Sequence, residues 1–121
     1  MDAIRPPELQ RRLESSDPPV ILDIRPREAY QQSAIERSHN VPVYDDLRSG
    51  NERALRDRLN EVPDGEVVVV CKQGIVAKRA TELLRDAGRE AETLAGGMGG
   101  WRGYRNGTFG YKLRSLLWRL R

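Results

Sequence analysis

The sequence predicts an α/β domain with a mainly parallel central sheet flanked by helices on both faces. Strand and helix signals alternate along the chain, as parallel sheets with crossover helices require. The strongest predicted strand, residues 66–70, contains four consecutive valines without polar alternation, which is typical of a strand covered on both faces. The chain has 121 residues, enough for one compact core and too few for two ordinary domains.

The first half of the chain predicts two helices and two strands. Proline is favoured just inside the first turn of a helix, where its missing N–H would have no partner in any case. Pro6 and Pro26 therefore mark two expected helix starts. The apolar run 20–22 predicts a buried strand that ends at Asp23, and residues 40–43 predict a short extended segment.

The middle and the end of the chain continue this order. Residues 51–62 predict one amphipathic helix that stops at the Pro63 turn. After the valine strand, apolar residues at helical spacing predict a further helix that ends at Gly88. Residues 92–95 predict a last short strand, and the glycine-rich stretch 96–110 is expected to be a turn region.

The composition limits the function classes. One cysteine excludes an intramolecular disulfide, and with a single histidine there is no Cys/His zinc site. The longest apolar run, 67–71, is far shorter than the roughly 18 residues of a membrane-spanning helix. The N-terminus lacks a basic and apolar leader. We expect a cytoplasmic protein without metal or cofactor.

The charge is unevenly distributed. Residues 1–101 carry 15 bases and 18 acids, whereas residues 102–121 carry six bases and no acid. Nucleic-acid binding depends on a basic face that releases counterions from phosphate, so no nucleic acid is expected on the body of the domain. Any anionic partner is expected at the tail.

Cys71 is the candidate nucleophile. It lies where the valine strand meets the next helix, and ligands of parallel sheets bind at the carboxyl ends of strands. The N–H groups of a helix start and the cation of Lys72 would both stabilise negative charge on sulfur. The alternative is a purely structural residue, because free cysteine is among the most buried residue types.

Four segments of the chain resemble the rhodanese domain, the sulfurtransferase fold. They contain its Asp-x-Arg strand end, the stretch leading into the second strand, the Cys-x-x-Gly-x-x-Ala/Ser loop and the Leu-x-Gly-Gly-x-x-x-Trp ending. Their order and spacing over roughly residues 4–103 make the resemblance specific. The segments are 20–25 (VILDIR), 35–42 (IERSHNVP), 67–77 (VVVVCKQGIVA) and 94–101 (LAGGMGGW).

The resemblance implies a sulfurtransferase. The Cys71 thiolate would take the outer sulfur of thiosulfate, a polysulfide or a protein persulfide, and would pass it as a persulfide to a thiophilic acceptor. Backbone N–H groups of the following loop would stabilise the anionic persulfide. The expected substrate-binding residues are Lys72, Gln73, Gly74, Ile75 and Val76.

Other residues of the resemblance are expected to support the site. Asp23 and Arg25 should face the same sheet edge and fix loop geometry rather than transfer protons. His39 is expected to be a hydrogen-bonded structural histidine and Trp101 a packing residue. The glycine pair at 96–97 is expected to form a turn that lets the backbone approach closely.

The sequence departs from the family pattern at two points. Residues 33–35 are Ser-Ala-Ile where many members have Gly-His-Ile, and Val76 stands where thiosulfate-active members often carry Arg or Thr. An apolar Val76 leaves Lys72 as the cation of the loop. This favours a protein-bound persulfide or a polysulfide over a small dianion as the donor.

Two other function classes compete with the sulfurtransferase. A related phosphatase or arsenate reductase needs an arginine six positions after the cysteine to clamp an oxyanion. That position is Ala77, and the first downstream arginine is Arg79, so this class is disfavoured. A noncatalytic interaction or sulfur-relay module stays open until turnover is measured.

The predicted domain organisation is a rhodanese-like domain over residues 1–103 and a basic amphipathic helix over 104–121. We expect this helix to dock on the domain, because one apolar stripe normally finds a core. The alternative, a surface for a membrane or a partner protein, is kept open by Trp118, which lies off the stripe. The stripe consists of Phe109, Leu113, Leu116, Leu117 and Leu120.

Overall fold

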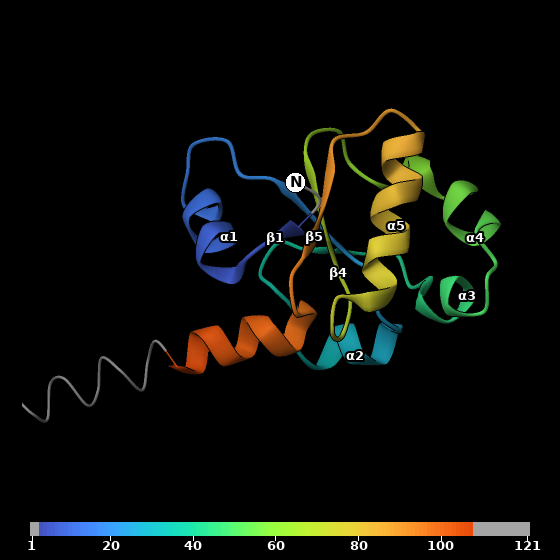
Figure 1. Ribbon diagram of the computed structural model, residues 1–121. Coiled ribbons are helices and arrows are strands. Elements are labelled where there is room, and N and C mark those ends of the chain that lie inside the picture. The colour runs from blue at the N-terminus through green and yellow to red at the C-terminus, as the bar shows by residue number, and fades with distance from the viewer. Residues whose placement is uncertain (1–2, 108–121) are drawn as a thin grey trace, which may run out of the picture.

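The fold is a five-stranded parallel sheet between two layers of helices, as the computed structural model in Figure 1 shows; residues 3–107 are described. The strand order is β1-β5-β4-β2-β3, and each of the neighbouring pairs is parallel. The predicted α/β class with a mainly parallel sheet is confirmed. The strands are β1 (Ala3–Ile4), β2 (Val20–Asp23), β3 (His39–Asn40), β4 (Val67–Val70) and β5 (Ala91–Leu94).

The helices lie on both faces of the sheet (Figure 1). Pro6 occupies the first turn of the first helix, and Pro26 caps the second, as the sequence predicts. A last helix covers residues 97–107. The others are α1 (Pro6–Leu13), α2 (Arg27–Gln32), α3 (Tyr44–Arg48), α4 (Arg53–Arg56), the 3-10 turn η1 (Leu59–Glu61) and α5 (Ile75–Asp86).

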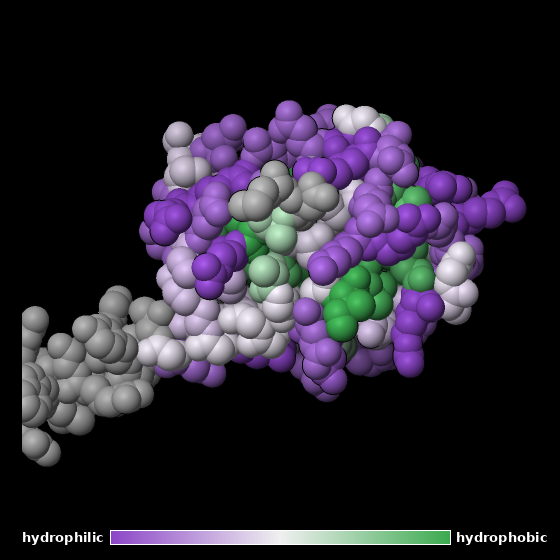
Figure 2. Space-filling model, viewed as in Figure 1, coloured by the Kyte–Doolittle hydropathy of each residue, from purple (hydrophilic) through white to green (hydrophobic). Residues whose placement is uncertain are grey.

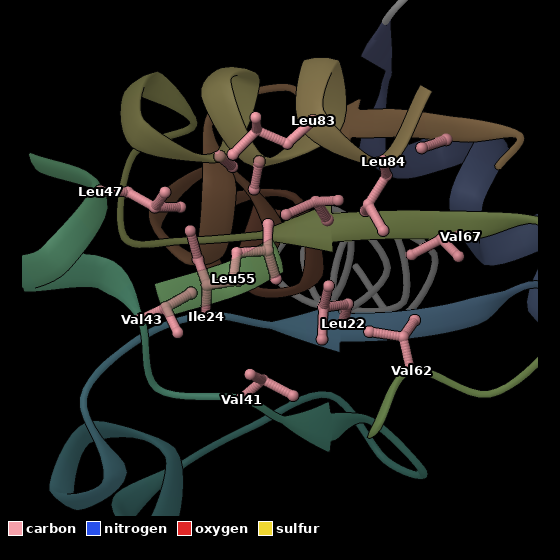
Figure 3. Close-up of a cluster of buried hydrophobic side chains, with 14 of the residues drawn as sticks. Leu22, Ile24, Val41, Val43, Leu47, Leu55, Val62, Val67, Leu83 and Leu84 are labelled. Atoms are coloured by element: carbon pink, nitrogen blue, oxygen red, sulfur yellow. The ribbon is translucent and has the colours of Figure 1, made fainter. Parts of the chain in front are cut away.

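The valines of β4 build two cores at once. Val67 and Val69 belong to a first cluster with side chains from α3, α4 and α5, which Figure 3 shows in close-up. Val68 and Val70 point to the other face and join a second cluster with residues of α1 and of helix 97–107. All four are at most 1% exposed, which explains why this strand has no polar alternation.

The register of the sheet brings three strand ends to one edge. Asp23, the last residue of β2, is paired with Val70, the last residue of β4. Val69 pairs with Thr93 near the end of β5. The segments that follow these three strands therefore lie together at the carboxyl edge, where ligands of parallel sheets bind.

Two predicted elements are wrong in extent. Residues 51–62 are not one helix: the chain forms α4, then η1 after a break at Asp57 and Arg58. The expected turn region at 96–110 is helical over 97–107, because buried Met98 and Trp101 anchor the segment despite its glycines. The predicted strands are shifted slightly, and β1 and α3 were not predicted.

The tail expectations fall largely outside the described part of the chain. The predicted boundary after residue 103 lies within helix 97–107, which runs past it. The apolar stripe from Phe109 onward lies outside residues 3–107. Within the described range, no helix is both long and apolar enough to cross a membrane.

Candidate active site

Cys71 lies at the carboxyl edge of the sheet, directly after β4 and three residues before the N-cap of α5. The four valines before it fix the strand in the core, so the backbone that carries the thiol is held from both faces. Cys71 itself is 1% exposed and belongs to the first core cluster. The residue is thus part of the core and also the first residue of the loop.

The sulfur of Cys71 receives a backbone hydrogen bond. The N–H of Gly74 donates to the Sγ atom over 3.1 Å. Gly74 has φ +88° and caps the start of α5, a 12-residue helix whose free N–H groups carry partial positive charge. The thiol is therefore next to a hydrogen-bond donor and a positive helix end, a setting that suits an anionic sulfur.

The loop residues divide into exposed and packed ones. Lys72 and Gln73 are exposed, whereas Gly74 is buried. Val76 is half-buried and packs against the first core cluster. Ile75 is 72% exposed, the one exposed large apolar side chain within residues 3–107. The outward apolar residue of the loop is thus Ile75, where the sequence pointed to Val76; Figure 2 shows an apolar spot where α5 begins.

The glycine turn after β5 packs directly on this loop, as predicted for residues 96–97. Gly97 has φ +58°, and a Cβ atom there would lie 2.4 Å from the carbonyl oxygen of Cys71. The N–H of Met98 donates to the Cys71 carbonyl over 2.8 Å, and the N–H of Gly99 donates to the Lys72 carbonyl over 3.0 Å. The sequence showed the glycines but not these hydrogen bonds.

Asp23 and Arg25 form a buried ion pair beside the Cys71 strand. Their side chains are 1% and 5% exposed, and an Arg25 terminal nitrogen lies 2.8 Å from Asp23 Oδ2. The Nε–H of Arg25 donates to both carboxylate oxygens, and Asp23 Oδ1 also accepts the backbone N–H of Arg25. Arg25 donates further to the Ser33 carbonyl over 2.7 Å. This geometry fixes the turn between β2 and α2.

Asn40 completes this turn and was missed by the sequence analysis. Its side-chain nitrogen donates to the carbonyl oxygens of Asp23 and Arg25 over 2.9 and 3.0 Å. The sequence signal was the Asn40 side-chain amide at the start of an extended segment. From this place a side-chain N–H can bond backbone carbonyls that follow the neighbouring strand. No sequence signal marks the Ser33 carbonyl as a partner of Arg25, because every residue type has a backbone carbonyl.

Two further sequence-predicted residues have different outcomes. Trp101 is 8% exposed in the second core cluster, so its expected packing role is confirmed. His39 is exposed on β3, and its imidazole has no hydrogen-bond partner among residues 3–107. The expected hydrogen bond is therefore not found within the described part of the chain, where β3 is the outer strand and leaves this side chain exposed.

Arg79 does not serve as an oxyanion clamp. Its guanidinium lies on α5 and bonds Glu82 over 2.7 Å, and it also pairs with Glu52. The hydrogen bond that Arg79 donates to Glu82 is the main reason why the pKa of Arg79 is raised. Its donors are committed to carboxylates, which adds to the case against phosphate chemistry.

The reactive group at the carboxyl edge of the sheet is the Cys71 thiol. Within the described chain, no three His, Cys, Asp or Glu side chains gather in a way that could hold a metal ion. The arrangement at Cys71 supplies a buried sulfur, a backbone donor and a helix start. These groups suit a covalent intermediate on sulfur that carries negative charge.

Comparison with known proteins identifies related chains. The sequence profile of the rhodanese-like domain matches residues 5–104. An adenylyltransferase and sulfurtransferase of Zea mays is 32% identical over 96 residues, and an HTH-type transcriptional regulator of Mycobacterium tuberculosis is 36% identical over 104. The crystal structure of a rhodanese-like domain protein from Staphylococcus aureus superposes with a TM-score of 0.70 at 27% identity.

The extent of these matches differs. The matched regions cover 78% and 84% of this chain but only 20% of the maize protein and 42% of the mycobacterial regulator. The chain therefore corresponds to one part of each curated relative. The staphylococcal structure matches almost end to end, with 84% of this chain and 91% of that one covered.

Proposed function

The chain belongs to the rhodanese-like domain family, and on this premise we propose that it is a sulfurtransferase with Cys71 as its nucleophile. The observation that carries the proposal is the Cys71 sulfur, placed at the start of α5 with the Gly74 N–H donating to it. The maize relative is named a sulfurtransferase, which supports the reaction class.

The proposed reaction has two steps. The Cys71 thiolate attacks the outer sulfur of a sulfane donor, the bond between that sulfur and the rest of the donor breaks, and the remainder leaves with the electron pair. With thiosulfate the leaving group is sulfite, and Cys71 carries a persulfide anion. A thiophilic acceptor such as cyanide or a thiolate then attacks the outer persulfide sulfur and releases the Cys71 thiolate.

The remaining residues have supporting roles in this proposal. Lys72, Gln73, Gly74, Ile75 and Val76 form the substrate-binding loop. Its backbone N–H groups stabilise the persulfide anion in a site of low water access. Asp23 and Arg25 hold the neighbouring turn and do not take part in proton transfer.

The proposal is tested by intact mass spectrometry after incubation with thiosulfate or polysulfide. We expect wild type to gain one sulfur atom, and dithiothreitol or cyanide to remove it. Cys71→Ser should gain none, because the hydroxyl cannot form a persulfide. This variant keeps nearly the same shape and is the matched control.

Turnover separates the enzyme from a noncatalytic module. Repeated formation of thiocyanate from thiosulfate and cyanide supports the enzyme. A persulfide that forms but is not passed on indicates a sulfur-relay module. An unmodified wild-type mass with every donor would contradict the sulfurtransferase and leave an interaction domain.

A further inference from the structure

We propose that the start of helix 97–107 is a positioning element for the Cys71 loop, with Gly97 and the backbone N–H of Gly99 as its decisive groups. The inference rests on the proposed sulfur chemistry and explains how the loop is held ready for an anion. It concerns residues that do not touch the sulfur and act through the loop backbone.

The Cys71 loop bonds the free N–H groups at the start of helix 97–107. The first N–H groups of an α-helix have no partner inside the helix and are usually bonded by a side-chain cap. Gly100 makes the first i to i−4 bond, to the Gly96 carbonyl, over 2.9 Å. The two residues before it, Met98 and Gly99, donate their N–H groups to the carbonyl oxygens of Cys71 and Lys72 instead. The loop backbone therefore caps this helix.

The bonds to the helix start also fix the direction of the loop peptides. In a trans peptide the C=O and the following N–H point in opposite directions. With the Cys71 and Lys72 carbonyls bound to the helix start, the N–H groups of Lys72 and Gln73 must point away from it. Together with the Gly74 N–H, which already donates to sulfur, they form a run of donors suited to an anion.

Gly97 lies directly against the backbone of the Cys71 loop. A Cβ atom at this position would lie 2.4 Å from the Cys71 carbonyl oxygen and 2.7 Å from the Gln73 nitrogen. Both are backbone atoms of the loop, so the loop would have to move. The positive φ of Gly97 also disfavours any other residue. Glycine at position 97 therefore permits the close contact between helix and loop in which the N–H groups of Lys72 and Gln73 point away from the helix start.

The same helix supplies matched variants. Gly99→Pro removes the N–H that bonds Lys72, and proline is tolerated in the first turn of a helix. Gly99→Ala keeps that N–H and places its Cβ atom 3.5 Å from the Lys72 carbonyl, an ordinary contact. Gly103→Ala lies further along the helix and meets nothing within 4 Å. The two alanine variants control for changes in the helix.

Persulfide formation with thiosulfate is the first readout. We expect Gly97→Ala to be slower by on the order of tenfold to a hundredfold, because a misplaced donor set costs about this much. Gly99→Pro should be slower by roughly threefold to tenfold, while both controls should stay within about twofold of wild type. Melting temperatures separate this loss from unfolding. Equal rates in all variants would overturn the inference.

A second readout does not depend on sulfur transfer. In the full chain carrying Cys71→Ser, sulfate is titrated while the amide resonances of Lys72, Gln73 and Gly74 are followed by NMR. We expect sulfate to shift these three amides and to bind several-fold more weakly when Gly97→Ala or Gly99→Pro is added. No shift in the parent, or equal affinity in all variants, overturns the inference. Weakened sulfate binding in a protein that never forms a persulfide would contradict the proposed function instead.

Discussion

At the scale of single residues, Cys71 shows why position in the sheet matters more than residue type. The same cysteine could be a core residue or a nucleophile, and the structure gives it features of both: it is 1% exposed and its sulfur accepts the Gly74 N–H. The strand that buries the residue also delivers it to the helix start. The two interpretations from the sequence were therefore not exclusive.

The pair Asp23 and Arg25 shows how far sequence reasoning reaches at this scale. The spacing of the two residues after a strand predicted a structural pair, and their side chains do bond each other. The partners beyond the pair, the Ser33 carbonyl and the Asn40 side chain, depend on how the following turn folds. No local pattern encodes them, because they come from 8 and 15 to 17 residues away.

The exposure of Ile75 leads to a prediction about donor choice. Ile75→Arg should raise kcat/KM for thiosulfate several-fold, because a cation at an exposed loop position contributes about 1 kcal/mol toward a dianion. Ile75→Gln, which adds polarity without charge, is the control. Both variants are assayed with thiosulfate and with an uncharged organic trisulfide as the donor, at low and high salt.

Salt makes this prediction specific. The gain with Ile75→Arg should shrink at high ionic strength, since screening weakens charge interactions at an accessible site. Val76→Arg, by contrast, should lower the free energy of unfolding, because the Val76 side chain packs on the first core cluster. A thiosulfate gain that is equal at all salt concentrations would show that the substitution acts through loop geometry.

At the scale of elements, the segment 51–62 shows where periodicity misleads. Leu55 and Leu59 are four residues apart and would share one face of a continuous helix. The chain breaks between them, so Leu55 is 0% exposed in α4 while Leu59, in η1, is half-buried. Spacing alone could not reveal the break, because it depends on how the segment packs against the first core (Figure 3).

This difference gives a stability prediction. Leu55→Ala should lower the free energy of unfolding by about 2–5 kcal/mol, the usual cost of emptying a buried leucine site. Leu59→Ala should cost clearly less, because part of that side chain is already in solvent. Urea denaturation of both variants gives the two values. Equal losses would fit a continuous helix and contradict the break.

The last helix makes the opposite point about elements. Five glycines at 96, 97, 99, 100 and 103 argue for a turn by propensity, and the segment is nevertheless helical. Burial of Met98 and Trp101 and the bonds to the Cys71 loop outweigh the propensity. Tertiary contacts thus determine that this segment is helical, and the local sequence does not reveal them. Strand β4 could be predicted from the sequence, because four consecutive valines are typical of a strand buried on both faces.

At the scale of the whole molecule, α1 and helix 97–107 contribute to the core on the second face of the sheet, and a groove remains on that face. A groove of about 610 Å³ lies between α1 and helix 97–107. Leu13, Ile35 and Trp101 line it, and Arg105 lies at its rim with its guanidinium 5.6 Å from the centre of the Trp101 ring. The helix that borders this groove leads directly into the basic tail.

This arrangement gives a location for the tail that the sequence predicts to dock. We propose that the leucine stripe of the tail covers the groove on the second face, as one apolar stripe normally finds a core. Glu14 and Glu36 line the groove, and their charge is opposite to that of the bases in the tail. Truncation after Gly107 should then lower the melting temperature, by roughly 4–8 °C for each kcal/mol lost from the free energy of unfolding. It should also promote aggregation, because the groove would be left uncovered. Persulfide formation on Cys71 should persist, because the loop contacts end at Gly99.

A charge variant of the full chain separates docking from membrane binding. Arg114→Gln combined with Arg119→Gln keeps every leucine of the stripe and removes two cations. If the tail docks, this variant melts close to wild type while the truncated chain does not. If the tail is a membrane surface, the truncated chain melts like wild type, and both variants lose sedimentation with anionic liposomes, since each cation near such a surface contributes about 1 kcal/mol. We expect the first pattern, because five apolar side chains left in water would cost the isolated chain more than two lost cations.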